Sequence, residues 1–173
     1  MGTCRNGPAV SGRPISDVVY LVDTNILSAS APTKAVTQSD LCNWMDTNSR
    51  HLFVSVITVA EIEDGISRSR RAGAHAKAGR LADWLETVLH LYADRVLPID
   101  LPVARHIGTL MDRARGQGHD PGLADVAIAA TATLRGYTVL TRNLRHFAAL
   151  GVKLIDPWVG LPPDAATDIS SRT

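Results

Sequence analysis

The chain has 173 residues, of which 45% are hydrophobic and 20% are charged, and its formal net charge at pH 7 is +1. This length and composition predict one well-packed domain and exclude two domains of ordinary size. The near-neutral charge excludes a global basic field, so any contact with nucleic acid must come from a local patch.

The two cysteines, Cys4 and Cys42, are too few for a disulfide framework and lack the spacing of metal ligands. No apolar run reaches the length of a membrane span, and the start of the chain lacks the apolar centre of a secretory signal. We therefore expect a cytoplasmic protein with no membrane partner.

Both ends of the chain differ in composition from the middle. Residues 1–17 are rich in Gly, Pro, Ser and Arg without periodicity, which predicts a disordered leader or a start codon placed too early. Residues 159–173 predict a flexible C-terminal tail for the same reason. The expected domain therefore spans residues 18–158.

Within this domain, short apolar runs alternate with helical patterns. Residues 18–22 form a continuous apolar run, which is typical of a strand buried on both faces. Further strands are expected at 51–56, 95–99, 137–140 and 152–155. Helices are expected at 39–48, from 57 onward, at 72–92, 101–115 and 123–134, with a short piece ending at 150. This alternation predicts an α/β fold with right-handed crossovers.

Three acids lie at the edges of separate apolar segments. Asp23 follows the first strand, Glu61 lies in the first turns of the helix after the second, and Asp125 lies in the first turn of an Ala-rich helix. In such folds ligands bind outside the carboxyl ends of the strands. We expect Asp23, the Glu61 region and the turn 141–143 to share that rim, with Asp125 joining them from its helix N-terminus.

Three carboxylates gathered in one cleft predict a metal site. Each pair at about 4 Å repels by roughly 4 kcal/mol at an effective dielectric near 20, and a divalent cation reverses that sign. Oxygen ligands without Cys or His suit Mg²⁺ or Mn²⁺. Such a cation can activate water and neutralise charge on phosphate, so the pattern favours hydrolysis of a phosphodiester.

Two other phosphate-handling folds fit less well. A receiver domain needs an acidic pair from an earlier strand, and nothing acidic precedes Asp17, which is most simply a solvated residue. A haloacid-dehalogenase-type phosphatase needs a second Asp two residues after the first, where this chain has Asn25.

Four segments then carry a family resemblance. They are, in order, VVYLVDTNILS, VSVITVAEIEDGI, GLADVAIAATA and TVLTRNLRHFAALGVKLIDPW. Each is weak alone, but their order and spacing resemble the four blocks of PIN domains, in particular the VapC/FitB-type toxin ribonucleases. The resemblance runs from about Val18 to Trp158.

The resemblance implies a fold and a set of site residues. The fold would be a three-layer sandwich around a five-stranded parallel sheet in the order 3-2-1-4-5. The acids Asp23, Glu61 and Asp125 would bind the catalytic metal. Supporting polar residues that orient the acids or nearby waters would be Thr24, Asn25, Thr141 and Asn143.

The fourth block departs from the family pattern, which often has an acid there. This chain offers Asn143, whose amide oxygen can still ligate, and His146, a poorer match for Mg²⁺. The number of metals therefore stays open. For His146 we favour a surface or helix-end residue over a catalytic role. Asp64 is a candidate partner of Glu61, and Asp120 either replaces the fourth acid or stabilises a turn, which we favour.

The basic residues between 68 and 80 form the one basic concentration of the sequence. They border the Glu61 helix and can bind RNA phosphates, or they form an ordinary solvated face. Arg142 and Arg145 would lie on the opposite lip. The candidates for RNA binding are Arg68, Arg71, Arg142 and Arg145.

These observations favour a Mg²⁺-dependent endoribonuclease that is the toxin of a type II, VapBC-like toxin–antitoxin module. The resemblance also implies a homodimer and a small VapB-like antitoxin whose C-terminal segment occludes the acidic cleft. Two alternatives stay open: a PIN-like binding module with little activity, and a DNA nuclease, because phosphodiester chemistry alone does not distinguish the sugars.

Overall fold

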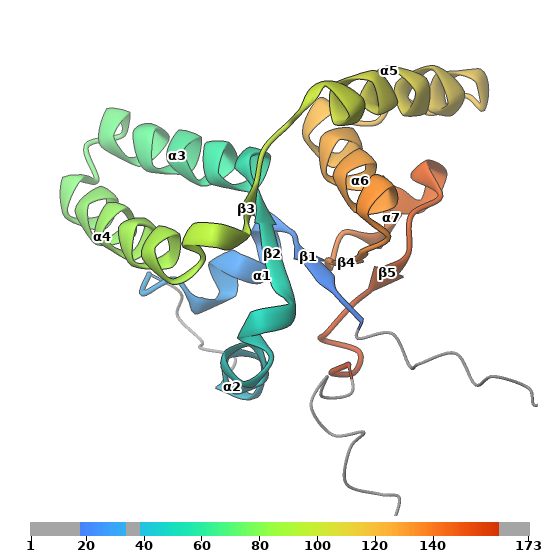
Figure 1. Cartoon of the computed structure of the whole chain (residues 1–173). Helices are drawn as coiled ribbons and strands as arrows, with labels where there is room; N and C mark the ends of the chain where they lie inside the picture. Colours follow the sequence, from blue (N-terminus) through green and yellow to red (C-terminus); the bar gives the residue numbers. More distant parts are fainter. Residues whose placement is uncertain (1–17, 34–38, 163–173) are drawn as a thin grey trace, which may run out of the picture.

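The computed structural model describes residues 18–33 and 39–162, which form three layers (Figure 1). Five parallel strands make the middle layer, in the order β3-β2-β1-β4-β5. They are β1 Tyr20–Val22, β2 Leu52–Ser55, β3 Val96–Leu97, β4 Thr138–Leu140 and β5 Leu154–Ile155. The predicted α/β fold and strand order are confirmed.

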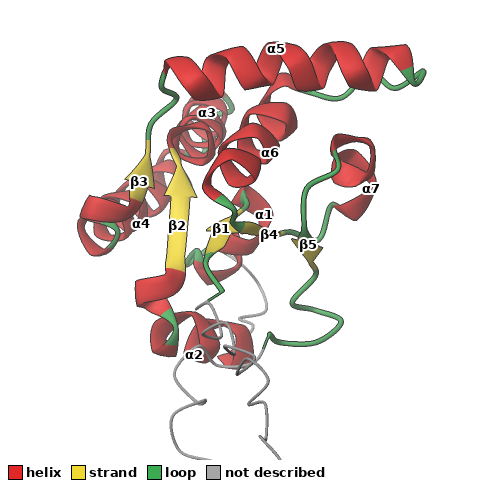
Figure 2. Cartoon of the chain, turned by 45° about the vertical axis from the view of Figure 1, so that its right-hand side comes forward, coloured by secondary structure: helices red, strands yellow, loops and turns green. Residues whose placement is uncertain are grey.

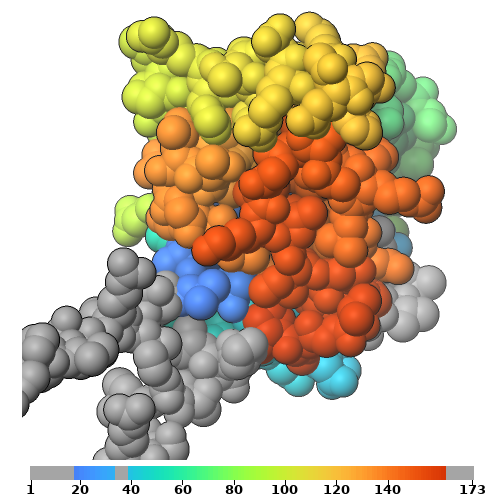
Figure 3. Space-filling model, turned by 90° about the vertical axis from the view of Figure 1, so that its right-hand side faces the viewer, coloured from blue at the N-terminus to red at the C-terminus, as the bar shows by residue number. Residues whose placement is uncertain are grey.

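Helices cover both faces of this sheet (Figure 2). The α-helices are α1 Thr24–Leu27, α2 Ser39–Thr47, α3 Val56–Arg71, α4 His75–Leu91, α5 Leu101–Gly116, α6 Leu123–Arg135 and α7 Leu144–Phe147. Short 3₁₀ turns are Ser28–Ser30, Ser49–His51, Ala93–Arg95 and Ala148–Leu150. Helix α5 lies over the segment that follows α7 (Figure 3). Arg113 of α5 donates a hydrogen bond to the Leu150 carbonyl oxygen at 2.8 Å.

Strand β1 is buried on both faces, which explains its uninterrupted apolar sequence. Tyr20 and Val22 pack into the core formed with α2, α3 and α4. Leu21, which points the other way, packs into the core formed with α5 and α6. Since β1 is the central strand, its end places Asp23 in the middle of the carboxyl edge of the sheet.

The edge strands β3 and β5 are shorter than the predicted ranges 95–99 and 152–155. Each pairs with a single neighbour, β2 or β4. Strand β3 ends directly before Pro98, whose nitrogen has no hydrogen to donate to a ladder. Strand β5 begins only after the left-handed turn at Gly151, where φ is +66°.

The predicted leader, residues 1–17, and residues 163–173 of the predicted tail lie outside the described residues. The described part of the tail, residues 159–162, contains no helix or strand. Across 18–33 and 39–162, no helix has the length and apolar character needed to cross a membrane.

Candidate active site

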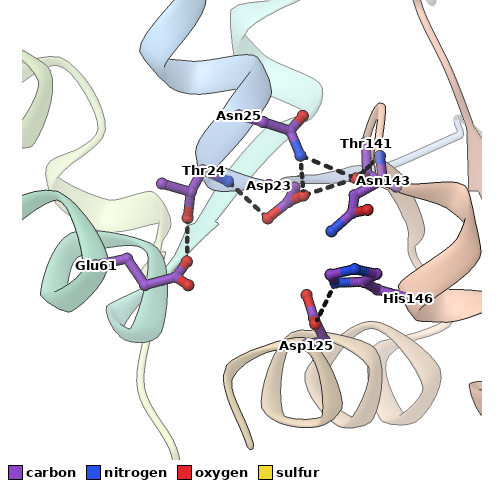
Figure 4. Close-up of polar contacts among 8 residues, drawn as sticks. All are labelled: Asp23, Thr24, Asn25, Glu61, Asp125, Thr141, Asn143 and His146. Carbon is purple, nitrogen blue, oxygen red and sulfur yellow. Dashed lines mark hydrogen bonds and ion pairs between the residues drawn. The ribbon is translucent and has the colours of Figure 1, made fainter. Parts of the chain in front are cut away.

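Asp23 is the centre of the candidate site, at the carboxyl end of β1. It caps the N-terminus of α1, and its Oδ1 accepts a hydrogen bond from the Thr24 backbone N–H at 2.7 Å. Its Oδ2 accepts from the Asn25 amide at 2.5 Å and from the Thr141 hydroxyl at 2.6 Å (Figure 4). The residue is only 5% exposed, so these donors replace the water that the carboxylate loses on burial.

The polar residues around Asp23 join the ends of the neighbouring strands β1 and β4. Asn25 donates through Nδ2 to the Thr141 hydroxyl oxygen at 3.2 Å, and its Oδ1 accepts from the Arg142 backbone N–H at 3.1 Å. The Asn143 backbone N–H donates to the same Thr141 oxygen at 2.9 Å. Thr141 is fully buried, so this network fixes the orientation of the Asp23 carboxylate from two strands.

Glu61 approaches Asp23 from α3, which begins after β2 with Ser55 as its N-cap. Glu61 is exposed, and its Oε2 accepts a hydrogen bond from the Thr24 hydroxyl (Figure 4). Asp64, considered as a partner of Glu61, instead forms a 3.1 Å ion pair with Arg68. Its side chain is 61% exposed, so it belongs to the surface of α3.

Asp125 enters from the first turn of α6, with its side chain 20% exposed. Its Oδ2 lies 3.1 Å from Nδ1 of His146 on α7 (Figure 4). His146 is 59% exposed, as the favoured surface interpretation expects, but that interpretation missed the contact with the third acid. The sequence feature that could have indicated this contact is the position of His146 in the fourth block, where the family often has an acid.

The negative charges of Glu61 and Asp125 act on Asp23. Burial raises the pKa of Asp23, and the charges of Glu61 and Asp125 raise it further, while hydrogen bonds from Thr141 and Thr24 lower it. Within the described ranges, the ion pairs found involve neither Asp23 nor Glu61. The site therefore offers an oxygen-lined, negatively charged position.

This donor set fits a hard divalent cation, since all three acids supply carboxylate oxygens. In the part of the chain that the structure describes, no three Asp, Glu, His or Cys side chains stand close enough together to ligate one ion. The Glu61 carboxylate is bonded to Thr24 and the Asp125 carboxylate to His146. The Glu61 side chain is exposed and the Asp125 side chain is 20% exposed, so both carboxylates reach solvent.

The predicted basic residues lie at different places around the acids. Arg68 lines two cavities that Glu61 also lines, of about 290 and 420 Å³. Arg142 lies over the Trp158 ring, with its guanidinium carbon 4.6 Å from the ring centroid. Arg145 lines a cavity with His146. Arg71 is exposed at the C-terminal end of α3, several turns beyond Glu61.

Asp120, for which we favoured a turn-stabilising role, lies in the loop between α5 and α6. Its Oδ1 is 3.9 Å from Arg115 Nε, and its side chain is 91% exposed. Such an exposed pair contributes little to stability.

Comparison with known proteins identifies the family. A model of the PIN domain family matches residues 20–153, a span that holds all three acids. This chain belongs to the PIN domain family. The PIN domain is 35% identical over 149 residues to VapC ribonuclease Y4jK of Sinorhizobium fredii, covering 81% of this chain and 98% of the relative. It is 34% identical over 142 residues to Toxin FitB of Neisseria gonorrhoeae, covering 81% and 99%.

Solved structures support the same assignment. The crystal structure of FitAcB from Neisseria gonorrhoeae superposes on this PIN domain with a TM-score of 0.70 at 33% identity, covering 81% of this chain and 99% of that one. A DNA-bound VapBC from Salmonella typhimurium gives a TM-score of 0.61 at 26% identity, covering 80% and 98%. The resemblance seen in the four sequence blocks is thus confirmed.

Proposed function

We propose that this PIN domain is a divalent-metal-dependent endoribonuclease, with Mg²⁺ or Mn²⁺ held by Asp23, Glu61 and Asp125. One observation carries the proposal: Asp23 after β1, Glu61 on α3 and Asp125 on α6 lie around one space at the carboxyl edge of the sheet (Figure 4), and the charges of Glu61 and Asp125 both act on the buried Asp23. The relatives named VapC ribonuclease Y4jK and Toxin FitB support RNA as the substrate.

The position of each of the three acids indicates its role. Asp23 is held by Thr24, Asn25 and Thr141, so it is the preorganised ligand. To complete such a site, Glu61 and Asp125 would turn from their present partners, Thr24 and His146. A bound divalent cation supplies a Lewis acid that neutralises charge on the cleaved phosphate and activates water at neutral pH. No side chain then needs to attack the phosphate.

The biological role that fits best is the toxin of a type II toxin–antitoxin module in the cytoplasm. The relatives named VapC ribonuclease and Toxin FitB support it, as do the similar solved structures of FitAcB and of VapBC. The proposed partner is a small VapB-like antitoxin whose C-terminal segment covers the acidic cleft. The proposed active form is a homodimer.

Cleavage assays test the enzymatic part of the proposal. Purified protein is incubated with structured RNA, and with DNA of the same sequence, in Mg²⁺ or in excess EDTA. We expect cleavage of RNA alone, only with the metal, and a loss of at least a hundredfold in Asp23→Asn because each missing ligand weakens the site. The matched control is Asp112→Asn, an exposed acid on α5.

Four outcomes would contradict the proposal. Cleavage that survives EDTA or Asp23→Asn excludes this mechanism, and equal cleavage of DNA replaces it by a general nuclease. Equal arrest of bacterial growth by wild type and Asp125→Asn would indicate that the protein acts by binding rather than by cleavage.

A further inference from the structure

The cavity lined by Arg145 and His146, of about 210 Å³, borders the Asp125 side of the site. We call it the flanking pocket, and its lining residues are His119, Asp120, Pro121, Gly122, Arg145, His146 and Ala149. Two observations connect it to Asp125. His146 in its wall contacts Asp125 Oδ2 at 3.1 Å, and a Cβ added at Gly122 would lie 3.5 Å from the same oxygen. The flanking pocket and the active site therefore share a wall.

The lining of the flanking pocket favours an anion. Arg145 contributes a permanent positive charge, and His119 and His146 contribute imidazole rings that can donate hydrogen bonds. Asp120 is the one carboxylate among these lining residues, and it faces Arg115 at 3.9 Å and is largely in water. Arg145 is the lining residue whose planar donor fork matches the oxygens of a phosphate.

The shape of the flanking pocket indicates which part of a nucleic acid enters it. The lining contains no Phe, Tyr or Trp, and of its two imidazole rings that of His146 is already engaged with Asp125, so the pocket offers little aromatic surface on which a base can stack. The volume corresponds to roughly seven water molecules, enough for a phosphate group with its remaining hydration. A phosphate is therefore a better fit than a base.

We propose that the flanking pocket binds the RNA phosphate next to the one cleaved at the acids, with Arg145 as its main contact. This inference rests on the proposed ribonuclease function. On the other side of Asp23, Arg68 and Lys77 line the cavity of about 290 Å³ that Glu61 shares. The strand would thus cross the acidic centre with positive charge on both sides, which offsets its repulsion by the carboxylates.

RNA binding without cleavage gives the first test. Binding of a single-stranded RNA is measured in EDTA across a range of salt concentrations for wild type, Arg145→Ala and Arg50→Ala. Arg50 is the matched control because it is exposed and lies before β2, at the opposite edge of the sheet. We expect Arg145→Ala to bind several-fold more weakly and its salt slope to fall by about 0.7, the value for one lost phosphate contact. Arg50→Ala should match wild type.

The second test locates the phosphate. Single phosphates around the cleaved bond are replaced one at a time by neutral methylphosphonates, and each RNA is measured with wild type and Arg145→Ala. The two changes should be non-additive at the phosphate adjacent to the cleaved bond and additive elsewhere. Equal thermal melting of the variants shows that folding is unchanged, since Arg145 is exposed.

The possible failures are distinct. Affinity and salt slope that are the same in Arg145→Ala and Arg50→Ala, or additivity at every phosphate, would overturn the assignment of the flanking pocket while wild type still cleaves RNA. Failure of wild type to cleave RNA in Mg²⁺ would instead overturn the proposed function itself.

Discussion

Asp23 combines deep burial with three hydrogen-bond donors and a raised pKa. Burying Asp23 lowers the stability of the folded state, because the ionised carboxylate loses water and has two acids as neighbours. Residues arranged this way are typical of functional sites, where a bound ligand offsets the destabilisation caused by burying a charged group. This loss of folding stability can be measured.

The pH dependence of folding should reveal the raised pKa of Asp23. Below the unfolded value near 3.8, both states hold the proton. As pH rises from there through the folded-state pKa, the unfolded state releases its proton first, so the metal-free protein loses stability. Urea denaturation from about pH 4 to about pH 7 should show this loss in wild type relative to Asp23→Asn. A relative gain over the same range contradicts the raised pKa.

Thr141 should support Asp23 specifically. Thr141→Val keeps the shape but removes the donor to Asp23 and the acceptor for Asn25 and Asn143. We expect a loss of about 1–3 kcal/mol of stability, and an acid limb of the RNA cleavage profile that moves to higher pH because a bond lowering the Asp23 pKa is gone.

The matched control for that variant is Thr131→Val. Thr131 is also fully buried, but its hydroxyl donates only to the Ala127 carbonyl oxygen within α6, at 2.8 Å. Its pH profile should match wild type. An identical shift in both variants would mean that general loosening, rather than the bond to Asp23, moves the acid limb.

The acids are positioned by the ends of helices and strands, and local sequence determines where each helix or strand begins and ends. Helix α6 carries Asp125 in its first turn and ends at Gly136, which adopts φ of +71° and donates its N–H to the Thr133 carbonyl oxygen. Only glycine takes this left-handed conformation without strain. The residue thus ends α6 two residues before β4 begins.

Replacing Gly136 by alanine should destabilise the protein by about 1 kcal/mol, since a Cβ is strained at positive φ. The control is Gly79→Ala inside α4, where a Cβ meets nothing within 4 Å and φ is not left-handed. This change should stabilise by about 0.5–1 kcal/mol through helix propensity. Thermal melting of both variants measures the difference, and effects of the same sign would contradict the assigned roles.

Local patterns were sufficient to predict the elements that carry the acids. The apolar run before Asp23 indicated a strand buried on both faces, and the change to helical period placed Glu61 on α3. The edge strands were predicted too long because pairing with one neighbour and the position of Pro98 are tertiary effects. The contact of His146 with Asp125 joins α7 to α6, and no periodicity predicts such a contact between helices.

At the scale of the whole molecule, the site couples segments far apart in the sequence. Asp23 directly follows β1, Glu61 and Asp125 lie on α3 and α6, and both hydrophobic cores hold these elements in place. A ligand that joins the three acids therefore stabilises the folded state against unfolding.

Metal binding should raise the thermal stability of the protein. At a Mg²⁺ concentration of about 100 times Kd, the gain is about 2.7 kcal/mol. For a chain of this size that corresponds to roughly 5–10 °C in Tm. Asp23→Asn should lose most of the shift, whereas Asp112→Asn should keep it. Equal shifts in the two variants would indicate that Mg²⁺ binds elsewhere.

The position of the metal is the most direct test of the ribonuclease site. Crystals of the protein grown with Mn²⁺ would be measured at the manganese absorption edge, where the anomalous signal marks the ion. We predict a peak at the carboxyl edge of the sheet, with oxygens of Asp23, Glu61 and Asp125 as ligands at about 2.0–2.2 Å. Ordered side chains with no ion between them, or an ion that contacts only one of the three acids, would contradict the shared metal site.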